Sequence, residues 1–236
     1  MKAMILAAGL GTRLQEMTTN KPKALVEING VPMLQMIIER LKKHGFNYIV
    51  INVHHHAKQI KEFLNNNDFG IDIDISDESD LLLNTGGGIK NAEKFLKGTA
   101  PFLVHNVDIY SEINLADMYN YHLNSDNLVT MAVRERVSTN FLLFDDNNRL
   151  CGWRSYKTNS EIISIKKNKY NELAFSGIHV ISPKIFDLFT QTGSFSIINE
   201  YLDLAKNHII GAYIHNNKDV LDLGRPEAIK KIENKN

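Results

Sequence analysis

The sequence predicts an α/β fold, a three-layer α/β/α sandwich with a mixed, mostly parallel central sheet. Short apolar segments of strand length alternate with segments whose apolar residues recur at helical spacing, and this order is typical of parallel strands joined by helices. The chain is 236 residues long, which suits one large core of this class. We therefore expect a single domain over residues 1–236.

The first half of the chain carries the alternation. Strands are expected at residues 3–8, 48–53, 71–75 and 102–105, and helices at residues 32–45, 59–64 and 89–96. Pro32 suits the first position of its helix. Because ligands of parallel sheets bind beyond the carboxyl ends of the strands, the segments that follow the first and fourth strands form the candidate site.

From Leu128 onward the pattern changes to strand-rich pieces separated by polar turns. Strands are expected at residues 128–133, 141–144, 173–181, 210–214 and 220–223, and helices at residues 183–190 and 197–207. We expect this half to shape a second pocket beside the first.

The composition excludes several classes of protein. Acidic and basic side chains number 27 each and no basic tract stands out, so nucleic acid and anionic membranes are not expected as partners. The single cysteine, Cys151, has no second cysteine with which to form a disulfide in the chain. The N-terminus shows no signal-peptide pattern and no segment has the length of a membrane span, so we expect a cytoplasmic protein.

The first predicted strand runs into a glycine loop and then into two cations. The loop is Ala8-Gly9-Leu10-Gly11-Thr12-Arg13, and Lys21-Pro22-Lys23 follows it. Glycines let backbone N–H groups approach a ligand closely, and phosphate oxygens are natural guests of such a loop. The Walker pattern needs Gly-Lys-Ser/Thr after its second glycine, and the dinucleotide fingerprint needs a third glycine at Leu14, so spacing excludes both.

The pattern that remains, Gly-x-Gly-x-Arg with Lys-Pro-Lys ten residues on, resembles the signature of the sugar-1-phosphate nucleotidyltransferases. The resemblance covers nearly the whole chain, from Lys2 to about Glu227. It implies a Rossmann-like fold of the nucleotide-diphospho-sugar transferase type, with residues 1–127 as the nucleotide-binding half and residues 128–236 as the sugar-phosphate-binding half. It also implies transfer of a nucleoside monophosphate to a sugar-1-phosphate, with release of pyrophosphate.

The resemblance assigns catalysis to Arg13, Lys23 and Asp108. Arg13 offers a forked, permanent charge that would hold the β- and γ-phosphates, and Lys23 offers a mobile charge near the reacting centre. Asp108 follows the fourth strand, and Asp222 opens an Asp-x-Gly-x-Pro-Glu segment. The metal-binding carboxylates of the family occupy the matching positions, which implies Mg²⁺. Taken singly, an aspartate at such a position is more often a turn or cap residue.

The segment Thr85-Gly86-Gly87-Gly88 precedes the helix expected to begin near Ile89. Its glycines allow close approach of a base or ribose. The alternative is that they only make the start of the helix flexible. The family reads the base with a glycine-containing loop here, and this form looks most like the muramate-1-phosphate uridylyltransferase branch. The nucleotide-binding residues that the resemblance implies are Ala8, Gly9, Gly11, Thr12, Arg13, Lys23, Thr85, Gly86 and Gly87.

The resemblance places the sugar at Asn106, Gly177 and Arg154. Gly177 would let a backbone amide meet the sugar, and a bulge within a strand is the alternative. If the sugar carries a carboxylate, Arg134, Arg136 or Arg154 could bind it bidentately, although any one of them is more often a solvated surface residue.

The favoured reaction is uridylyl transfer from UTP to N-acetylmuramate-1-phosphate. Guanylyl transfer from GTP to mannose-1-phosphate or a heptose-1-phosphate is the alternative. Val107 replaces the small residue usual before the metal aspartate, and the Glu-Lys-Pro segment of the thymidylyl- and guanylyltransferases is absent after Arg134, so the sugar stays open. A nucleotide-sugar-binding regulatory module without turnover is the alternative of another class. We expect a monomer or a small homo-oligomer.

Overall fold

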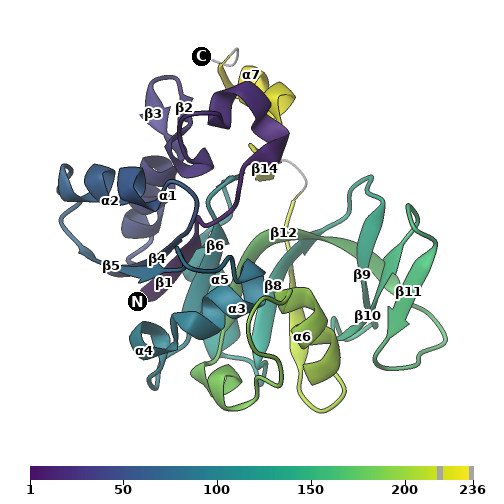
Figure 1. Cartoon of the computed structure of the whole chain (residues 1–236). Coiled ribbons are helices and arrows are strands. Elements are labelled where there is room, and N and C mark those ends of the chain that lie inside the picture. Colours follow the sequence, from purple (N-terminus) through teal and green to yellow (C-terminus); the bar gives the residue numbers. More distant parts are fainter. Residues whose placement is uncertain (217–219, 234–236) are drawn as a thin grey trace.

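A computed structural model describes residues 1–216 and 220–233 of the chain. A ten-stranded mixed sheet forms its centre, and helices pack on both faces of the sheet (Figure 1). The main path of the sheet runs in the order β11-β10-β9-β12-β6-β1-β4-β5. The α/β sandwich with a mixed sheet that the sequence predicts is confirmed.

Four neighbouring strands are parallel and carry the edge at which we expect a ligand. They are β6 (Phe102–Asn106), β1 (Lys2–Leu6), β4 (Tyr48–Val53) and β5 (Asp72–Asp77). Strands β1, β4 and β6 are buried along most of their length, as expected of parallel strands covered on both faces. Their carboxyl ends therefore open onto one edge of the sheet.

Antiparallel strands extend the sheet beyond β6. They are β12 (Asn171–Ile181), β8 (Val129–Arg134), β9 (Asn140–Phe144), β10 (Leu150–Ser155) and β11 (Ser160–Ile163), and β13 (Ile210–Ile214) runs parallel to β8. Strand β12 pairs with β6, so the two halves of the chain share one continuous sheet.

The side chains of β1 alternate between the two helical layers, because successive side chains of a strand point to opposite faces. Ala3 and Ile5 belong to one apolar core cluster and Met4 to the other. The first cluster contains the helices α1 (Met33–Lys43), α2 (Ala57–Asn65) and α5 (Leu115–Leu123), and the second contains α3 (Asn84–Asn91), α4 (Glu93–Leu96) and α6 (Ile197–Leu204). Within the described ranges, no helix is both long enough and apolar enough to cross a bilayer.

A third, smaller cluster lies beside the carboxyl edge. Its short elements are the 3-10 helices η1 (Thr12–Thr18) and η2 (Lys23–Leu25), the paired strands β2 (Glu27–Ile28) and β3 (Val31–Pro32), the paired strands β7 (Ile109–Ser111) and β14 (Val220–Asp222), and helix α7 (Pro226–Glu233). Leu14, Val26, Leu223 and Ile229 are buried together there. This cluster joins the segment after the glycine loop to the C-terminal segment.

Several predicted elements differ in the structure. Helix α3 begins at Asn84 and contains the three glycines, whereas the sequence places them before a helix at residues 89–96. A Cβ on Gly86 would collide with the ring of Phe195, so close packing explains the missing side chains. Pro32 lies before helix α1, and residues 183–190 form only the 3-10 helix η3 (Pro183–Asp187).

Three buried histidines make the stability of the fold depend on pH. Burial lowers the pKa of His105 and His122 to about 4 and that of His179 to about 3. In the unfolded chain these groups bind protons below about pH 6.5, whereas in the folded chain they stay neutral. The free energy of unfolding therefore falls as the pH drops below about 6.5, by up to about 1.4 kcal/mol per pH unit for each histidine.

Between pH 6 and pH 5, we expect the free energy of unfolding of the H122N variant to fall less steeply than that of the parent protein. The difference should be up to about 1.4 kcal/mol per pH unit, as measured by urea unfolding. Asparagine leaves a polar atom near Thr130 Oγ1, which lies 2.9 Å from His122 Nδ1, but it does not titrate. The matched control is H208N, which replaces a partly exposed histidine. Equal slopes in the parent protein and in H122N would contradict this account.

Candidate functional site

A cavity of about 440 Å³ opens at the carboxyl edge of the parallel strands. The glycine loop lies along one side of it and the beginning of helix α3 along the other. Its lining residues are Leu6, Ala8, Gly9, Leu10, Gly11, Thr12, Lys23, Asn52, Leu82, Asn84, Thr85, Asn106, Val107, Asp108 and Ser194. The cavity has the size and the mixed lining of a small-molecule site.

The glycine loop turns sharply after β1 because Gly11 adopts a positive φ of 70°, which costs a glycine little. A Cβ at Gly11 would lie 2.9 Å from Thr18 Cγ2, so the loop also packs closely against η1. Around Gly9 no atom lies within 4 Å of an added Cβ. The loop therefore has a packed side at Gly11 and an open side at Gly9.

Arg13 joins two carboxylates that are far apart in the sequence. Its Nη1 lies 3.0 Å from Asp222 Oδ2, and its Nη2 lies 3.3 Å from Asp108 Oδ2. Lys23 Nζ donates a hydrogen bond to the same Oδ2 of Asp108. The side chains of Lys23 and Asp108 are nearly buried, whereas that of Arg13 is half exposed. Two cations and two carboxylates thus meet at the rim of the cavity.

Asp108 and Asp222 meet through a small two-stranded sheet and not through neighbouring strands of the main sheet. Strand β14 lies outside the main sheet and pairs antiparallel with β7, so that Asp222 lies opposite Ile109. The backbone N–H of Leu223 donates to the carbonyl of Asp108 at 2.8 Å. The two carboxylates therefore come together because the C-terminal segment folds back and pairs with β7.

The donor set fits Mg²⁺. Among the described residues no group of three or more potential ligands of the His, Cys, Asp or Glu types occurs, but Arg13 bridges Asp108 and Asp222 at one point. Mg²⁺ prefers hard oxygen ligands and is commonly held by one or two carboxylates together with substrate phosphates. Asp108 and Asp222 supply such a pair.

Gly224 lies against this ion-pair cluster, and sequence reasoning did not single it out. A Cβ at Gly224 would lie 2.6 Å from Arg13 Nη2, 2.7 Å from Asp108 Oδ2 and 2.8 Å from Lys23 Nζ. The Gly224 N–H also donates to Asp222 Oδ1 at 3.0 Å. A side chain at this position would displace the ends of these three charged side chains.

A second hollow lies on the other side of Arg13. It consists of two adjoining cavities of about 170 and 730 Å³ that share Arg13, Arg136, Phe175 and Asp222. Phe141 and Trp153 also line the larger one, and Asn106 and Gly177 line the smaller one. Aromatic faces beside charged groups suit a ligand that has both an apolar face and an anionic group.

The strand bulge that the sequence offers as one interpretation of Gly177 is present, and Gly177 also borders a cavity. It lies at a bulge in β12, where pairing with β8 shifts between Phe175 and His179, and its φ is +74°. It also lines the smaller cavity, and an added Cβ would lie 2.9 Å from Asn106 Nδ2.

Three predicted site residues lie elsewhere. Gly86 and Gly87 do not line the cavity beside the glycine loop, because they pack against the Gly193–Phe195 segment. Arg154 lines neither part of the second hollow and pairs with Glu161 and Glu172, with 2.6 Å between its Nε and Glu161 Oε2. Successive residues of a strand face opposite sides, so β10 turns Trp153 toward the hollow and Arg154 away from it.

Conversely, the structure adds Asn52, Asn84 and Ser194 to the lining of the first cavity and Arg225 to that of the second hollow. Asn52 had a signal in the sequence, because it is a polar residue near the end of an apolar strand. Ser194 had none, since tertiary packing alone brings its loop to helix α3.

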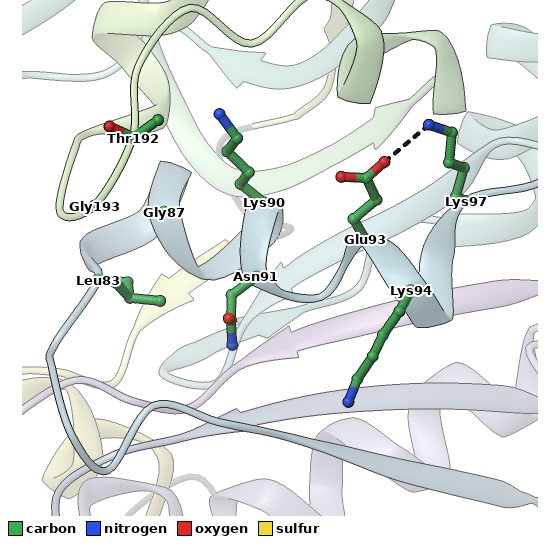
Figure 2. Close-up of a pocket in the computed structure, with 9 residues that line it drawn as sticks. All are labelled: Leu83, Gly87, Lys90, Asn91, Glu93, Lys94, Lys97, Thr192 and Gly193. Atoms are coloured by element: carbon green, nitrogen blue, oxygen red, sulfur yellow. Dashed lines mark hydrogen bonds and ion pairs between the residues drawn. The ribbon is translucent and has the colours of Figure 1, made fainter.

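A further hollow, at helices α3 and α4, is lined by lysines (Figure 2). Unlike Arg13 and Lys23, these lysines do not meet at one carboxylate. Lys90 Nζ is bound to the carbonyl of Gln191 at 2.7 Å, and Lys97 Nζ pairs with Glu93 at 2.8 Å. Figure 2 shows Lys94 pointing to the opposite side from Lys90. These cations do not gather around one point.

The fold and the site together define an α/β protein with a cavity, a glycine loop and two cations at the carboxyl edge of its sheet. The model of the Nucleotidyl transferase family matches residues 2–142. An N-acetylmuramate alpha-1-phosphate uridylyltransferase from Neisseria meningitidis is 32% identical over 188 residues, which cover 79% of this chain and 78% of that protein. A D-glycero-alpha-D-manno-heptose 1-phosphate guanylyltransferase from Campylobacter jejuni is 31% identical over 198 residues, 83% of this chain and 82% of that protein.

The crystal structure of HddC from Yersinia pseudotuberculosis complexed with GMP-PN is similar over 99% of this chain and 98% of that one, with a TM-score of 0.76 and 27% identity. The chain spans only 50 to 52% of the length of some other curated relatives that it matches. The chain belongs to the nucleotidyl transferase family, and its relatives are sugar-1-phosphate nucleotidyltransferases.

We expect the G224A variant to lose turnover on the order of a hundredfold, the scale of losing one preorganised charged partner. The added methyl group would push Arg13, Lys23 and Asp108 apart. The measurement is pyrophosphate release from a nucleoside triphosphate and a sugar-1-phosphate. The matched control is G98A, where an added Cβ meets nothing within 4 Å. Unchanged turnover in G224A would contradict the importance of the close approach.

Proposed function

We propose that the chain transfers a nucleoside monophosphate from a nucleoside triphosphate to a sugar-1-phosphate and releases pyrophosphate. The observation that carries this proposal is the bridge from Arg13 to Asp108 and Asp222, because it lies where the two cavities meet. Asp108 and Asn106 line both the cavity beside the glycine loop and the smaller part of the second hollow. Two substrates bound in these cavities would bring their reacting ends together there.

The proposed reaction is an in-line attack by a sugar-1-phosphate oxygen on the α-phosphorus of the nucleotide, with pyrophosphate as the leaving group. No nucleophile from the protein is needed, so catalysis depends on position and charge. Arg13 would hold the departing phosphates, and Lys23 would neutralise charge near the α-phosphorus. Backbone N–H groups of the glycine loop would bind the triphosphate.

Mg²⁺ is the proposed cofactor, and when bound it supplies positive charge to the phosphate oxygens. Asp108 and Asp222 would hold it. The short contacts of Arg13 and Lys23 with these carboxylates keep the cations at the edge of the cavity before any phosphate binds. We also propose residues 1–127 as the nucleotide-binding half and residues 128–236 as the sugar-binding half of one domain.

For the acceptor we propose N-acetylmuramate-1-phosphate, with UTP as the donor. The Neisseria relative supports this pair, and so does the Thr-Gly-Gly-Gly form at Thr85. The hollow offers three guanidinium groups besides Arg13, those of Arg134, Arg136 and Arg225, and guanidinium binds carboxylates bidentately. Arg134 is buried, and its Nη1 donates to the carbonyl of Val220 at 2.8 Å. The Nε of Arg225 lies 3.7 Å from Asp222 Oδ2. The carboxylate of the muramyl group would therefore meet Arg136 in the hollow, in place of the Arg154 that the sequence suggests.

The second candidate is guanylyl transfer from GTP to a heptose-1-phosphate or mannose-1-phosphate. The Campylobacter relative and the similarity to HddC in complex with GMP-PN favour it. The two candidates share the site around Asp108 and differ in the base and in the sugar.

A panel of the four nucleoside triphosphates against several sugar-1-phosphates with Mg²⁺, scored by pyrophosphate release, tests the proposal. We expect UTP with N-acetylmuramate-1-phosphate to give the highest kcat/KM. A maximum with GTP and a heptose phosphate would select the second candidate. No release with any pair would favour a nucleotide-sugar-binding module without turnover.

With the best pair, we expect K23A and D108A each to lose a hundredfold or more in turnover, because each removes one charge partner of the reacting phosphates. The matched control is K94A, which removes an exposed lysine from the hollow of Figure 2. Near-normal turnover in both K23A and D108A would refute the assigned roles.

We expect R136A to lower kcat/KM for N-acetylmuramate-1-phosphate roughly tenfold, the scale of one hydrogen-bonded charge pair. The value for N-acetylglucosamine-1-phosphate should stay within about twofold of the parent, since that sugar phosphate has no carboxylate to offer to Arg136. R154A is the control, since Arg154 is already paired with Glu161 and Glu172. Equal losses for both sugars would count against recognition of a carboxylate.

A further inference from the structure

Two buried polar side chains connect the walls of the nucleotide cavity, and the reaction proposed above does not use them. Asn52 lies near the end of β4 and lines the cavity, and Glu78 follows the end of β5. Their exposed fractions are 2% and 3%. A carboxylate is almost never buried to this degree without a specific partner.

Asn52 holds the glycine loop. Its Oδ1 accepts a hydrogen bond from the backbone N–H of Ala7 at 2.7 Å, at the point where β1 passes into the loop. Its Nδ2 donates to Glu78 Oε1, also at 2.7 Å. Because one amide atom accepts and the other donates, these two bonds fix the orientation of the Asn52 amide.

Glu78 holds the opposite wall. Its Oε2 accepts from the backbone N–H of Leu83 at 3.3 Å, directly before Asn84 and Thr85, which line the cavity. An added Cβ on Gly88 in helix α3 would lie 2.7 Å from Glu78 Oε1 and 2.9 Å from Asn52 Nδ2. The third glycine of α3 thus makes room for this pair, so the helix and the pair pack as one unit.

We propose that Asn52 and Glu78 are positioning residues that set the distance between the phosphate side and the base side of the nucleotide cavity. The chain of bonds runs from Ala7 N–H through Asn52 and Glu78 to Leu83 N–H, and so joins the two segments that would bind the two ends of a nucleoside triphosphate. The inference rests on the proposed function and adds residues that touch no reacting atom.

The direction of each hydrogen bond suggests a test in which the amide and the carboxylate are exchanged between positions 52 and 78. In N52D the new carboxylate would face that of Glu78, and two acceptors would repel each other. In E78Q the new amide can accept from Asn52, but its NH₂ group would then face the Leu83 N–H. In the double variant N52D/E78Q every bond can form again with its direction reversed between positions 52 and 78.

The experiment measures the Kd for UTP with Mg²⁺, or for GTP if the parent protein prefers it, by calorimetry without any sugar phosphate. We expect each single variant to weaken binding roughly tenfold, the scale of one hydrogen bond to a buried charged group. The double variant should return to within about threefold of the parent. In steady-state assays the single variants should raise the KM for the nucleotide much more than they lower kcat.

The matched control is Y48F, which removes the hydrogen bond from Tyr48 Oη to Asp74 Oδ2 between the same two strands, β4 and β5, at their other end. We expect the Kd in Y48F to stay within about twofold of the parent. If all variants change thermal stability but not the Kd, the pair is only structural and the inference is wrong. The inference is also wrong if the double variant binds no better than the weaker single variant.

Failure of the proposed function gives a different result. A parent protein that binds none of the four nucleoside triphosphates overturns the function, and this inference with it. A parent that binds one of them, together with variants that bind it equally well, overturns this inference alone.

Discussion

The ion pairs between Arg13 and the carboxylates of Asp108 and Asp222 are the constraint on which the site depends. The three residues come from the N-terminal loop, the middle of the chain and the C-terminal segment. Two carboxylates placed here repel each other, and Arg13 offsets this repulsion because it pairs with both. Leu14 and Leu223, the sequence neighbours of Arg13 and Asp222, are buried in the same small apolar cluster.

The parallel part of the sheet supplies the rest of the arrangement. Strands β1, β4 and β6 end at one edge, and each delivers a different kind of group there: the glycine loop after β1, Asn52 near the end of β4, and Asn106 with Asp108 at and after β6. Backbone N–H groups, an amide and a carboxylate thus line one cavity. The antiparallel strands add aromatic side chains to the neighbouring hollow, beside the charged groups of Arg13, Arg136, Asp222 and Arg225.

Much of the fold could be predicted from the sequence, because short apolar runs and helical spacing report burial directly. Strands β4 and β13 have the predicted bounds, and β6 and β12 differ by one or two residues. The glycines of α3 show why the rest could not be predicted. A glycine that admits a ligand and a glycine that admits a neighbouring side chain look alike in a sequence, and here Phe195 is the neighbour.

By itself the sequence determined the glycine loop and its two cations, since the spacing of Gly9, Gly11, Arg13 and Lys23 is a local property, and it determined the family. Only the tertiary structure decided which distant side chains join them. It brought Gly224 against Arg13, turned Trp153 rather than Arg154 toward the second hollow, and linked Asn52 to Glu78. These placements depend on strand pairing and on the side of the sheet that each residue faces. Both are fixed by contacts between segments that are distant in the sequence.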